Sequence, residues 1–281
     1  MIIRALLFVI AFLPLASSVE AGFLSNMRNI FVKHQHPVPS IDILVVNDQP
    51  SAVIEVNGKY QLYNPHTKKL ISKRYIGKKK LMQTDSSGLK WGEGFPGIFQ
   101  LTIIPDDPSV VITIDGTDYR GNVTVYDIGG AISIVNRIPI EEYLRATLPG
   151  KYGEPMPEET MAAIAIVART DAFYLSHNPK NKFWAVDGAQ VGYEGMKSLH
   201  PSSPMEMAIN STRHMVLSKT GAYEGKVTPF PAQWIDPQSH HQTGSNSRIT
   251  VYEAEDIART GGHAAQILSK AFPGSHIELI Y

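Results

Sequence analysis

Short runs of β-branched and other apolar residues, separated by turn signals, fill the first half of the chain after residue 40. The runs cover residues 41–46, 52–56, 61–63, 99–104, 110–114, 123–126 and 131–135. Their length and composition predict β-strands. Asn57-Gly58 and Asp115-Gly116 follow two of the runs and favour type I′ hairpin turns, which require positive φ at both central positions. We therefore expect this half to be mostly antiparallel β-structure.

Residues 157–175 have the pattern of one long, alanine-rich helix. Apolar residues recur at helical spacing and define a buried face, which comprises Met161, Ile164 or Ala165, Ala168, Ala172 and Leu175. Pro157 suits the first helical position, where its missing N–H is harmless, and Glu158 and Glu159 place negative charge at the positive end of the helix dipole. Because many positions on this face are alanine, a neighbouring sheet or helix can approach closely.

Shorter helices and strands surround this helix in the second half. The pattern predicts helices over residues 141–146, 203–214, 254–260 and 263–272, strands over 215–218 and 277–281, and a long exposed loop over 230–248. The helix at 203 begins with Ser203, Pro204 and Glu206, a capping-box arrangement. The expected fold class is α+β, with a β-rich part over residues 41–135 followed by a mixed helix and strand core over residues 136–281.

The first 21 residues resemble a secretory signal peptide. Arg4 gives a positive start, residues 5–16 form a short apolar run, and Val19-Glu20-Ala21 suits a cleavage site. The run is shorter than the roughly 20 apolar residues that a spanning helix needs, so membrane contact is expected only through an uncleaved signal. We therefore expect export to the periplasm or cell envelope, with residues 22–40 as a linker and residues 41–281 as the folded domain.

The amino-acid composition excludes some kinds of covalent cross-link and some kinds of partner. Cysteine is absent and the formal net charge is zero. A disulfide framework is thereby excluded, and bulk electrostatic capture of nucleic acid is not expected. A local basic cluster nevertheless comprises Lys68, Lys69, Lys73, Arg74, Lys78, Lys79 and Lys80. It is typical either of a solvated strand edge or of a surface that attracts an anionic wall polymer or membrane.

Five short motifs follow one another along the chain. They are Tyr119-Arg120-Gly121, Val135-Asn136 with Pro139 and Glu142-Tyr143-Leu144, residues 165–170, Gln190-Val191 with Tyr193 and Gly195, and Ile267-Leu268 with Phe272-Pro273-Gly274. Each motif is weak alone. Together, in this order and spacing, they are fairly specific and cover most of the chain beyond the signal. They resemble the SpoIID/LytB family, the stage II sporulation protein D and amidase-enhancer proteins that act on the bacterial cell wall.

The chain departs from the family pattern at three places. Lys151 stands at the ungapped position of the family's catalytic glutamate, and Glu154 lies three residues nearer the long helix. Residues 244–251 lose the histidine of the family's G-H-G-x-G-M-S-Q segment. Residues 187–190 lack the histidine and cysteines with which some members bind a structural zinc. We therefore expect no metal site of that kind, and the resemblance implies no other cofactor.

The resemblance implies a lytic transglycosylase that cleaves the bond between N-acetylmuramic acid and N-acetylglucosamine, with a preference for glycan strands lacking stem peptides. One carboxyl group suffices, because the 6-hydroxyl of the muramic acid replaces water. Glu154 is the candidate if three loop residues are deleted, since Gly153-Glu154-Pro155-Met156 then resembles S-E-M-P. Tyr152 and Met156 would supply apolar walls that raise its pKa. The alternative is an exposed loop acid.

Three more residues are candidates for sugar binding beside Tyr152. Arg169 can bind lactyl or acetamido groups of the sugar, or it can pair with a carboxylate such as Glu142 across the core. Gln190 and Tyr193 carry amide and phenol groups that suit ligands rich in hydroxyl groups, although tyrosines more often pack within a loop. The expected substrate-binding set is therefore Arg169, Gln190, Tyr193 and Tyr152.

Two functions remain open. The first is an exported peptidoglycan lytic transglycosylase with Glu154 as its acid and base. The second is a non-catalytic relative that binds peptidoglycan and recruits or stimulates a cell-wall amidase. Lys151 and the missing histidine allow this second function, because an ammonium group normally titrates far above the working pH of a general acid. Serine hydrolysis is not supported, since the chain has no G-x-S-x-G elbow.

Overall fold

The structure is a computed structural model. It describes residues 38–152, 156–179, 181–197, 199–219, 227–235 and 245–280. All of these except Val38 belong to one compact unit, Pro39–Tyr281. The predicted signal peptide, nearly all of the predicted linker and the proposed acid Glu154 lie outside the described residues.

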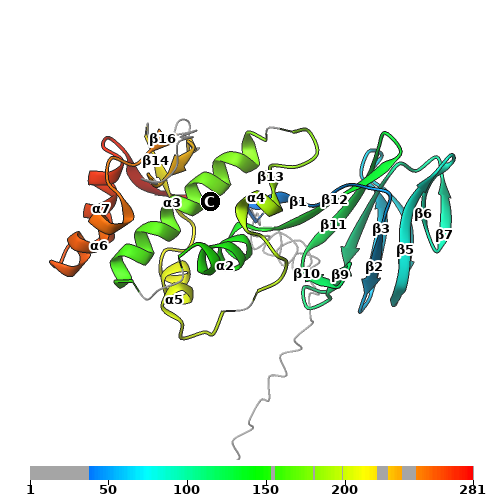
Figure 1. Cartoon of the computed structure of the whole chain (residues 1–281), viewed down its shortest axis with the longest axis horizontal. Coiled ribbons are helices and arrows are strands. Elements are labelled where there is room, and N and C mark those ends of the chain that lie inside the picture. Colours follow the sequence, from blue (N-terminus) through cyan, green and yellow to red (C-terminus); the bar gives the residue numbers. More distant parts are fainter. Residues whose placement is uncertain are drawn as a thin grey trace, which may run out of the picture. The chain divides into compact units, whose positions relative to one another are not determined.

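Two largely antiparallel sheets form the first half of this unit (Figure 1). The seven-stranded sheet has the order β13 (Val186–Asp187), β1 (Ser40–Gln49), β12 (Ala131–Pro139), β11 (Asn122–Ile128), β8 (Gln100–Pro105), β3 (Tyr60–Asn64) and β4 (Lys69–Arg74). The six-stranded sheet has the order β10 (Thr117–Tyr119), β9 (Ile112–Ile114), β2 (Ser51–Val56), β5 (Gly77–Asp85), β6 (Gly88–Trp91) and β7 (Glu93–Pro96). Among the described residues of these two sheets, β13 alone pairs in parallel, with β1. Buried residues of both sheets belong to one hydrophobic cluster.

One of the two predicted hairpin turns forms. Asp115 and Gly116 have φ of 47° and 89° and join the paired strands β9 and β10, as the type I′ prediction required. The same prediction for Asn57-Gly58 is wrong. Neither residue has positive φ, and the flanking strands β2 and β3 lie in different sheets. Asn57 instead accepts a hydrogen bond from the N–H of Val111 at 2.7 Å, which holds the chain where it crosses between sheets.

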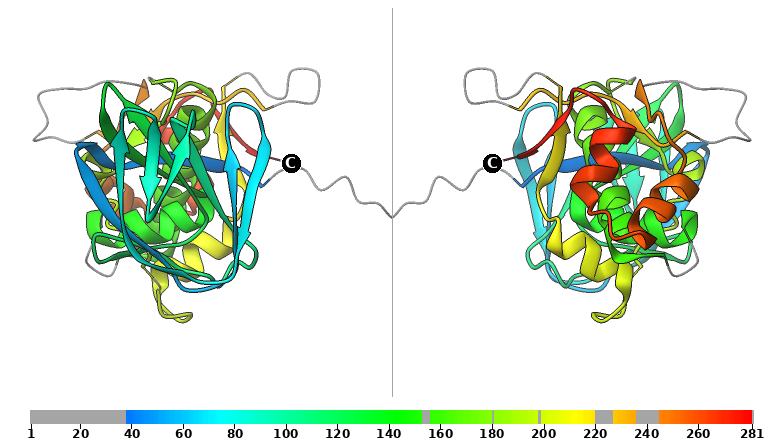
Figure 2. Two further views of the ribbon diagram at one scale, coloured as in Figure 1. Left: turned by 90° about the vertical axis from the view of Figure 1, so that its right-hand side faces the viewer. Right: turned by 90° about the vertical axis from the view of Figure 1, so that its left-hand side faces the viewer.

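Helices dominate the second half. They are α2 (Ile140–Lys151), α3 (Glu158–His177), α4 (Gly188–Val191), α5 (Pro204–Ser211), α6 (Val251–Arg259) and α7 (Ala264–Ala271). The strand β14 (Met215–Ser218) pairs antiparallel with β17 (His276–Leu279), and β15 (Ala232–Gln233) pairs in parallel with β16 (Ser245–Asn246) within the predicted long loop. Figure 2 views the unit from its sheets and from α6 and α7. The predicted α+β class, with its β-rich first half, is confirmed.

The helix α2 is longer than predicted. It continues through Pro149 and ends at Lys151. A proline inside a helix removes one backbone hydrogen bond and favours an end to the helix. Here Ala146, Thr147 and Leu148 are buried, so side-chain packing keeps the last turn helical. As a result, Lys151 lies in the last turn of α2 and Tyr152 directly follows it.

The helix α3 is buried on two sides. Met161, Ala165 and Ala172 belong to the large cluster shared with the sheets, as the predicted face required. Ala163, Ile166 and Val167 belong to a second cluster with α6, α7 and β14. The sequence pattern identified the first face alone. The second explains why so few positions of this helix are polar.

Candidate functional site

A cavity of about 650 Å³ lies beside the C-terminal end of α2 and the middle of α3. Its lining comprises Tyr143, Thr147, Leu148, Gly150, Lys151, Tyr152, Val167, Ala168, Asp171, Ala172, Gln190, Val191, Gly192, Glu194, Lys197, Ala232, Gln233, Trp234 and Asn246. The volume falls within the range of about 300–1,000 Å³ that is usual for ligand sites. Ala168 and Ala172 leave this space open, since larger side chains on the same face of α3 would project into it.

The polar groups of the lining suit a ligand rich in hydroxyl and amide groups. Gln190, Gln233 and Asn246 carry amides, which both donate and accept hydrogen bonds. Trp234 adds an indole ring, and its buried N–H has no hydrogen-bond partner among the described residues. The site therefore combines flat apolar surface with groups that can donate and accept.

Asp171 brings a carboxylate to the wall of this cavity. It lies on α3 between Ala168 and Ala172, and its Oδ2 accepts a long hydrogen bond of 3.5 Å from the Gln233 amide. Burial raises the pKa of the nearby Tyr143 phenol, and the negative charge of Asp171 raises it further. Tyr143 therefore remains a hydrogen-bond donor at any physiological pH. Asp171, Gln233 and Trp234 were not among the site residues predicted from the sequence. The helical spacing of α3 marks Asp171 only as a polar position near two alanines, and Gln233 and Trp234 lie in the segment predicted as a long loop.

The residues at the end of α2 also line the cavity. The Nζ atom of Lys151 lies 5.6 Å from the centroid of the Tyr152 ring, a distance typical of a cation–π contact. Lys151 lines the cavity, so its ammonium group is part of the candidate site. Glu154 follows two residues after Tyr152 but lies outside the described residues.

Gln190 and Tyr193, both predicted from the sequence to bind sugar, lie in different parts of the structure. Gln190 lines the cavity, whereas Tyr193 is buried and is not part of the lining. The Tyr193 hydroxyl donates to Oδ1 of Asn136 at 2.6 Å, and the Asn136 amide donates to the carbonyls of Arg120 and Asn122 at 2.8 and 3.1 Å. Burial raises the pKa of Tyr193, so its hydroxyl stays a donor. Three of the motifs that carry the family resemblance therefore meet in one hydrogen-bond cluster.

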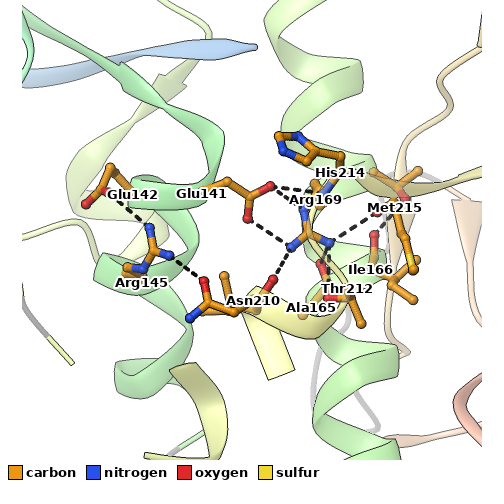
Figure 3. Close-up of polar contacts among 12 residues, drawn as sticks. Glu141, Glu142, Arg145, Ala165, Ile166, Arg169, Asn210, Thr212, His214 and Met215 are labelled. Atoms are coloured by element: carbon orange, nitrogen blue, oxygen red, sulfur yellow. Dashed lines mark hydrogen bonds and ion pairs between the residues drawn. The ribbon is translucent and has the colours of Figure 1, made fainter. Parts of the chain in front are cut away.

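Arg169 lies in the core, on α3 next to the cavity-lining Ala168. Figure 3 shows its polar contacts. Its side chain is fully buried, and its guanidinium donates from Nε and Nη2 to the two carboxylate oxygens of Glu141 at 2.9 and 3.0 Å. It also donates to the carbonyls of Ile209 and Met215, both at 3.2 Å. These are the contacts of a core ion pair, with Glu141 rather than Glu142 as the partner.

A second ion-pair cluster lies next to the first. Arg145 donates to Glu142 at 3.0 Å and to Asn210 at 2.9 Å (Figure 3). It also donates to the two carboxylate oxygens of Glu206, at 3.0 and 2.9 Å. Ser203 accepts the hydrogen bond from the N–H of Glu206 that caps α5, but the carboxylate of Glu206 is used by Arg145 instead. Only half of the predicted capping box therefore forms. The two clusters tie α2, α3 and α5 together and fix the first turns of α2, which carry Glu141, Glu142 and Arg145, against α3 and α5.

The described residues show no group of three or more histidines or carboxylates that could hold a metal ion. In the same part of the chain, no helix is both long and apolar enough to span a bilayer.

Comparison with known proteins identifies the family. A model of the SpoIID family, described as stage II sporulation protein, matches residues 129–218, which include the Arg169 cluster, most of the cavity and Tyr193. An uncharacterised protein of Chlamydia pneumoniae is 31% identical over 196 residues, covering 68% of this chain and 71% of the relative. One of Chlamydia muridarum is 26% identical over 244 residues, covering 86% of this chain and 78% of the relative.

A third uncharacterised relative, from Brachyspira hyodysenteriae, is 28% identical over 178 residues, covering 62% of this chain and 46% of its own length. No solved structure matches the chain. The predicted resemblance is confirmed by the family match and by the identity and coverage of the first relative. The chain is a member of the SpoIID family, whose domain indicates a function related to the bacterial cell wall.

Proposed function

We propose that this protein is an exported lytic transglycosylase that cleaves the glycan strands of peptidoglycan. The observation that supports this function best is the cavity at the end of α2, which offers a carboxylate, three amides and aromatic rings next to the segment that holds Glu154. Peptidoglycan glycan carries hydroxyl and acetamido groups along its whole length. These groups need partners of the kind that Gln190, Gln233 and Asn246 provide.

Glu154 acts as the acid and then as the base. Its protonated carboxyl donates a proton to the glycosidic oxygen as the bond to C1 of the muramic acid breaks. The resulting carboxylate then accepts the proton of the C6 hydroxyl, whose oxygen attacks C1 and closes the 1,6-anhydro ring. No water is consumed, and the glutamate ends in its starting state. Tyr152 and Met156 flank the segment and supply apolar surface that favours the protonated acid.

Asp171 binds the sugar in this scheme. Its carboxylate accepts hydrogen bonds from sugar hydroxyl groups or from an acetamido N–H, while Tyr143 donates from its protonated phenol. Asp171 lies deep beside Ala168 and Ala172, whereas Glu194, the other carboxylate of the described lining, is exposed and pairs with Lys197 at 2.9 Å. We therefore assign the sugar contact to Asp171.

The second candidate function is a non-catalytic peptidoglycan-binding protein that recruits or stimulates a cell-wall amidase. One observation favours it: Lys151, at the position of the family's catalytic glutamate, lines the cavity. An ammonium group holds its proton at neutral pH and cannot act as a general acid there without a large fall in its pKa. In this function the cavity binds the strand and performs no chemistry.

Incubation of the purified full-length protein with peptide-free glycan strands separates the two functions. Mass spectrometry of the products should detect anhydro-muramic ends for the wild-type protein. Glu154→Gln should abolish their formation while strand binding persists, and Asp171→Asn should weaken strand binding by about 1–3 kcal/mol, the usual effect of an unpaired buried hydrogen-bonding group. Glu194→Gln is the matched control, since it removes a carboxylate from the rim of the same cavity.

Each outcome has a distinct meaning. Anhydro products with full activity in Glu154→Gln would remove Glu154 from the mechanism. Strand binding without any anhydro product would reject the transglycosylase and support the second function, which predicts faster amidase hydrolysis in the presence of this protein. An Asp171→Asn variant that binds strands as tightly as Glu194→Gln would remove Asp171 from the site.

A further inference from the structure

Two large apolar side chains lie exposed next to each other where the chain passes from one sheet to the other. Tyr75 and Ile76 are 74% and 72% exposed, and they link β4, at the edge of the seven-stranded sheet, to β5 in the six-stranded sheet. Leu70 and Leu81, on the same two strands, are 45% and 46% exposed. Exposed apolar side chains that cluster in this way mark interaction surfaces more often than isolated ones do.

Positive charge surrounds this apolar pair. The basic residues are Lys68, Lys69, Lys73, Arg74, Lys78, Lys79 and Lys80. Arg74 pairs with Glu93, but no carboxylate of the described residues lies within ion-pairing distance of the six lysines. The Nζ atom of Lys59 lies 5.6 Å from the centroid of the Tyr75 ring and adds another charge. A chain with no formal net charge therefore concentrates cations on β4, β5 and the segments that flank them.

A hollow of about 300 Å³ lies at the same place. Its walls include Arg74, Lys78 and Lys80, together with Tyr60, Trp91 and Ile76. Glu93, the ion-pair partner of Arg74, also lines it, so the two lysines supply its unpaired positive charge among the described residues. The Tyr60 and Trp91 rings lie beside each other, with centroids 5.8 Å apart. Cationic groups next to apolar rings suit a phosphate group that is attached to an apolar molecule.

Protection of a sheet edge explains only part of this arrangement. Lysines on an edge strand discourage pairing with other chains, and this accounts for Lys69 and Lys73 on β4. The strand β5 is not an edge, since it pairs with β2 on one side and β6 on the other. Lys78, Lys79 and Lys80 on β5 therefore need another reason, and so do Tyr75 and Ile76.

We propose that the Tyr75–Lys80 face, with the basic residues around it, docks onto a bilayer containing anionic phospholipid. Tyr75 and Ile76 enter the interfacial region, where tyrosine is favoured, and the lysines and Arg74 bind lipid phosphates. An anionic wall polymer would satisfy the lysines but would offer no apolar environment to Ile76. Charge and apolar exposure together thus select the bilayer.

This docking is independent of the proposed catalysis. The strands β5 to β7 and the helices α6 and α7 lie at opposite ends of the unit, and the cavity lies beside α3 (Figure 1). A membrane that covers the Tyr75–Lys80 face leaves the cavity open. The docked protein would hold a glycan strand close to the membrane surface.

Co-sedimentation of the full-length protein with vesicles tests the proposal. Because the full chain carries the apolar N-terminal run, the measured quantity is the gain in binding when phosphatidylglycerol is added to phosphatidylcholine vesicles. The wild-type protein should show this gain, and high salt should reduce it. Tyr75→Ser/Ile76→Ser and Lys73→Gln/Lys78→Gln/Lys79→Gln should each lower it by about tenfold or more, since one basic residue near an anionic surface contributes about fivefold.

Matched controls come from the helical half of the chain. Tyr252→Ser/Leu279→Ser removes two exposed apolar side chains, and Lys182→Gln/Arg248→Gln/Lys270→Gln removes three exposed charges, all outside this face. Both controls should keep the gain. A wild-type protein without any gain overturns the proposal. A gain that needs the lysines but not Tyr75 and Ile76 also overturns it, because the apolar pair would then make no contribution to contact with the bilayer.

Discussion

Arg169 on α3 and Glu141 on α2 form a buried bidentate ion pair, with N···O distances of 2.9 and 3.0 Å. The pair joins α2, whose C-terminal end lines the cavity, to α3, whose middle lines it. A buried guanidinium that loses its carboxylate keeps its desolvation penalty, so the pair is sensitive to loss of either partner. The position of the cavity wall thus depends on an interaction that lies outside the cavity.

Glu141→Gln should destabilise the protein strongly. The variant leaves Arg169 charged, buried and without its carboxylate, and we expect the free energy of unfolding to fall by about 3–5 kcal/mol. Urea unfolding followed by circular dichroism measures the change. Glu142→Gln is the matched control, because Glu142 is the adjacent residue and pairs with Arg145 nearer the surface, where loss of a pair typically costs about 0–1 kcal/mol. Equal effects of the two variants would contradict the assigned role of the buried pair.

Tyr193→Phe should affect stability and leave glycan binding unchanged. The substitution removes the 2.6 Å hydrogen bond to Asn136 and leaves a buried carbonyl oxygen without that donor. Such a loss typically costs about 1–3 kcal/mol. Thermal unfolding and strand binding, measured on the same sample, distinguish this structural role from the predicted sugar contact. Weaker strand binding at unchanged stability would reinstate Tyr193 as a substrate-binding residue.

Gly121→Ala should be far more damaging than Gly129→Ala. Both glycines have positive φ, +77° and +68°, which alanine adopts at a cost of about 1–3 kcal/mol. At Gly121 an added Cβ would also lie 2.3 Å from the carbonyl oxygen of Arg137, whereas at Gly129 it would meet no atom within 4 Å. We expect the free energy of unfolding to fall by about 2–5 kcal/mol for Gly121→Ala, since backbone must move as well. Similar losses in both variants would show that the close approach of β12 is unimportant.

Glu159 should make stability depend on pH in acid. Its Oε2 accepts a hydrogen bond of 2.6 Å from the N–H of Ala264, and this bond, with His263 nearby, holds the pKa of Glu159 below its ordinary value of 4.5. A carboxyl whose pKa is lowered by folding stabilises the protein above its unfolded pKa, and this stabilisation is lost as the pH falls through the folded value. The stability difference between wild type and Glu159→Gln should therefore be constant near neutrality and shrink below about pH 4.

Urea unfolding at neutral pH and at about pH 3 measures that difference. Glu158→Gln serves as the control, because the side chain of Glu158 is exposed at the same helix end. A difference between wild type and Glu159→Gln that persists unchanged in acid would show that the bond to Ala264 does not couple α3 to α7.

The periodic pattern of the sequence predicted most of the helices and strands. Each wrong or missing prediction has a physical cause. The lysine-rich strands β4 and β5 were not predicted, because their runs of charged residues interrupt the alternation of apolar and polar positions that indicates a strand. Asn57-Gly58 favours a type I′ turn, but no hairpin forms there, because the chain crosses from the six-stranded sheet to the seven-stranded sheet. At Pro149 buried neighbours outweighed the helix-breaking tendency of proline.

By itself, the sequence determined the fold class, the long buried helix and the family, because these depend on short-range periodicity and on motif order. Only the tertiary structure decided that Arg169 pairs with Glu141 in the core and that Tyr193 binds Asn136. Only the tertiary structure, too, placed Asp171, Gln233 and Lys151 around one cavity. These contacts join residues on separate helices and strands, and residues far apart in sequence come together only when the packing of the core fixes where each side chain points.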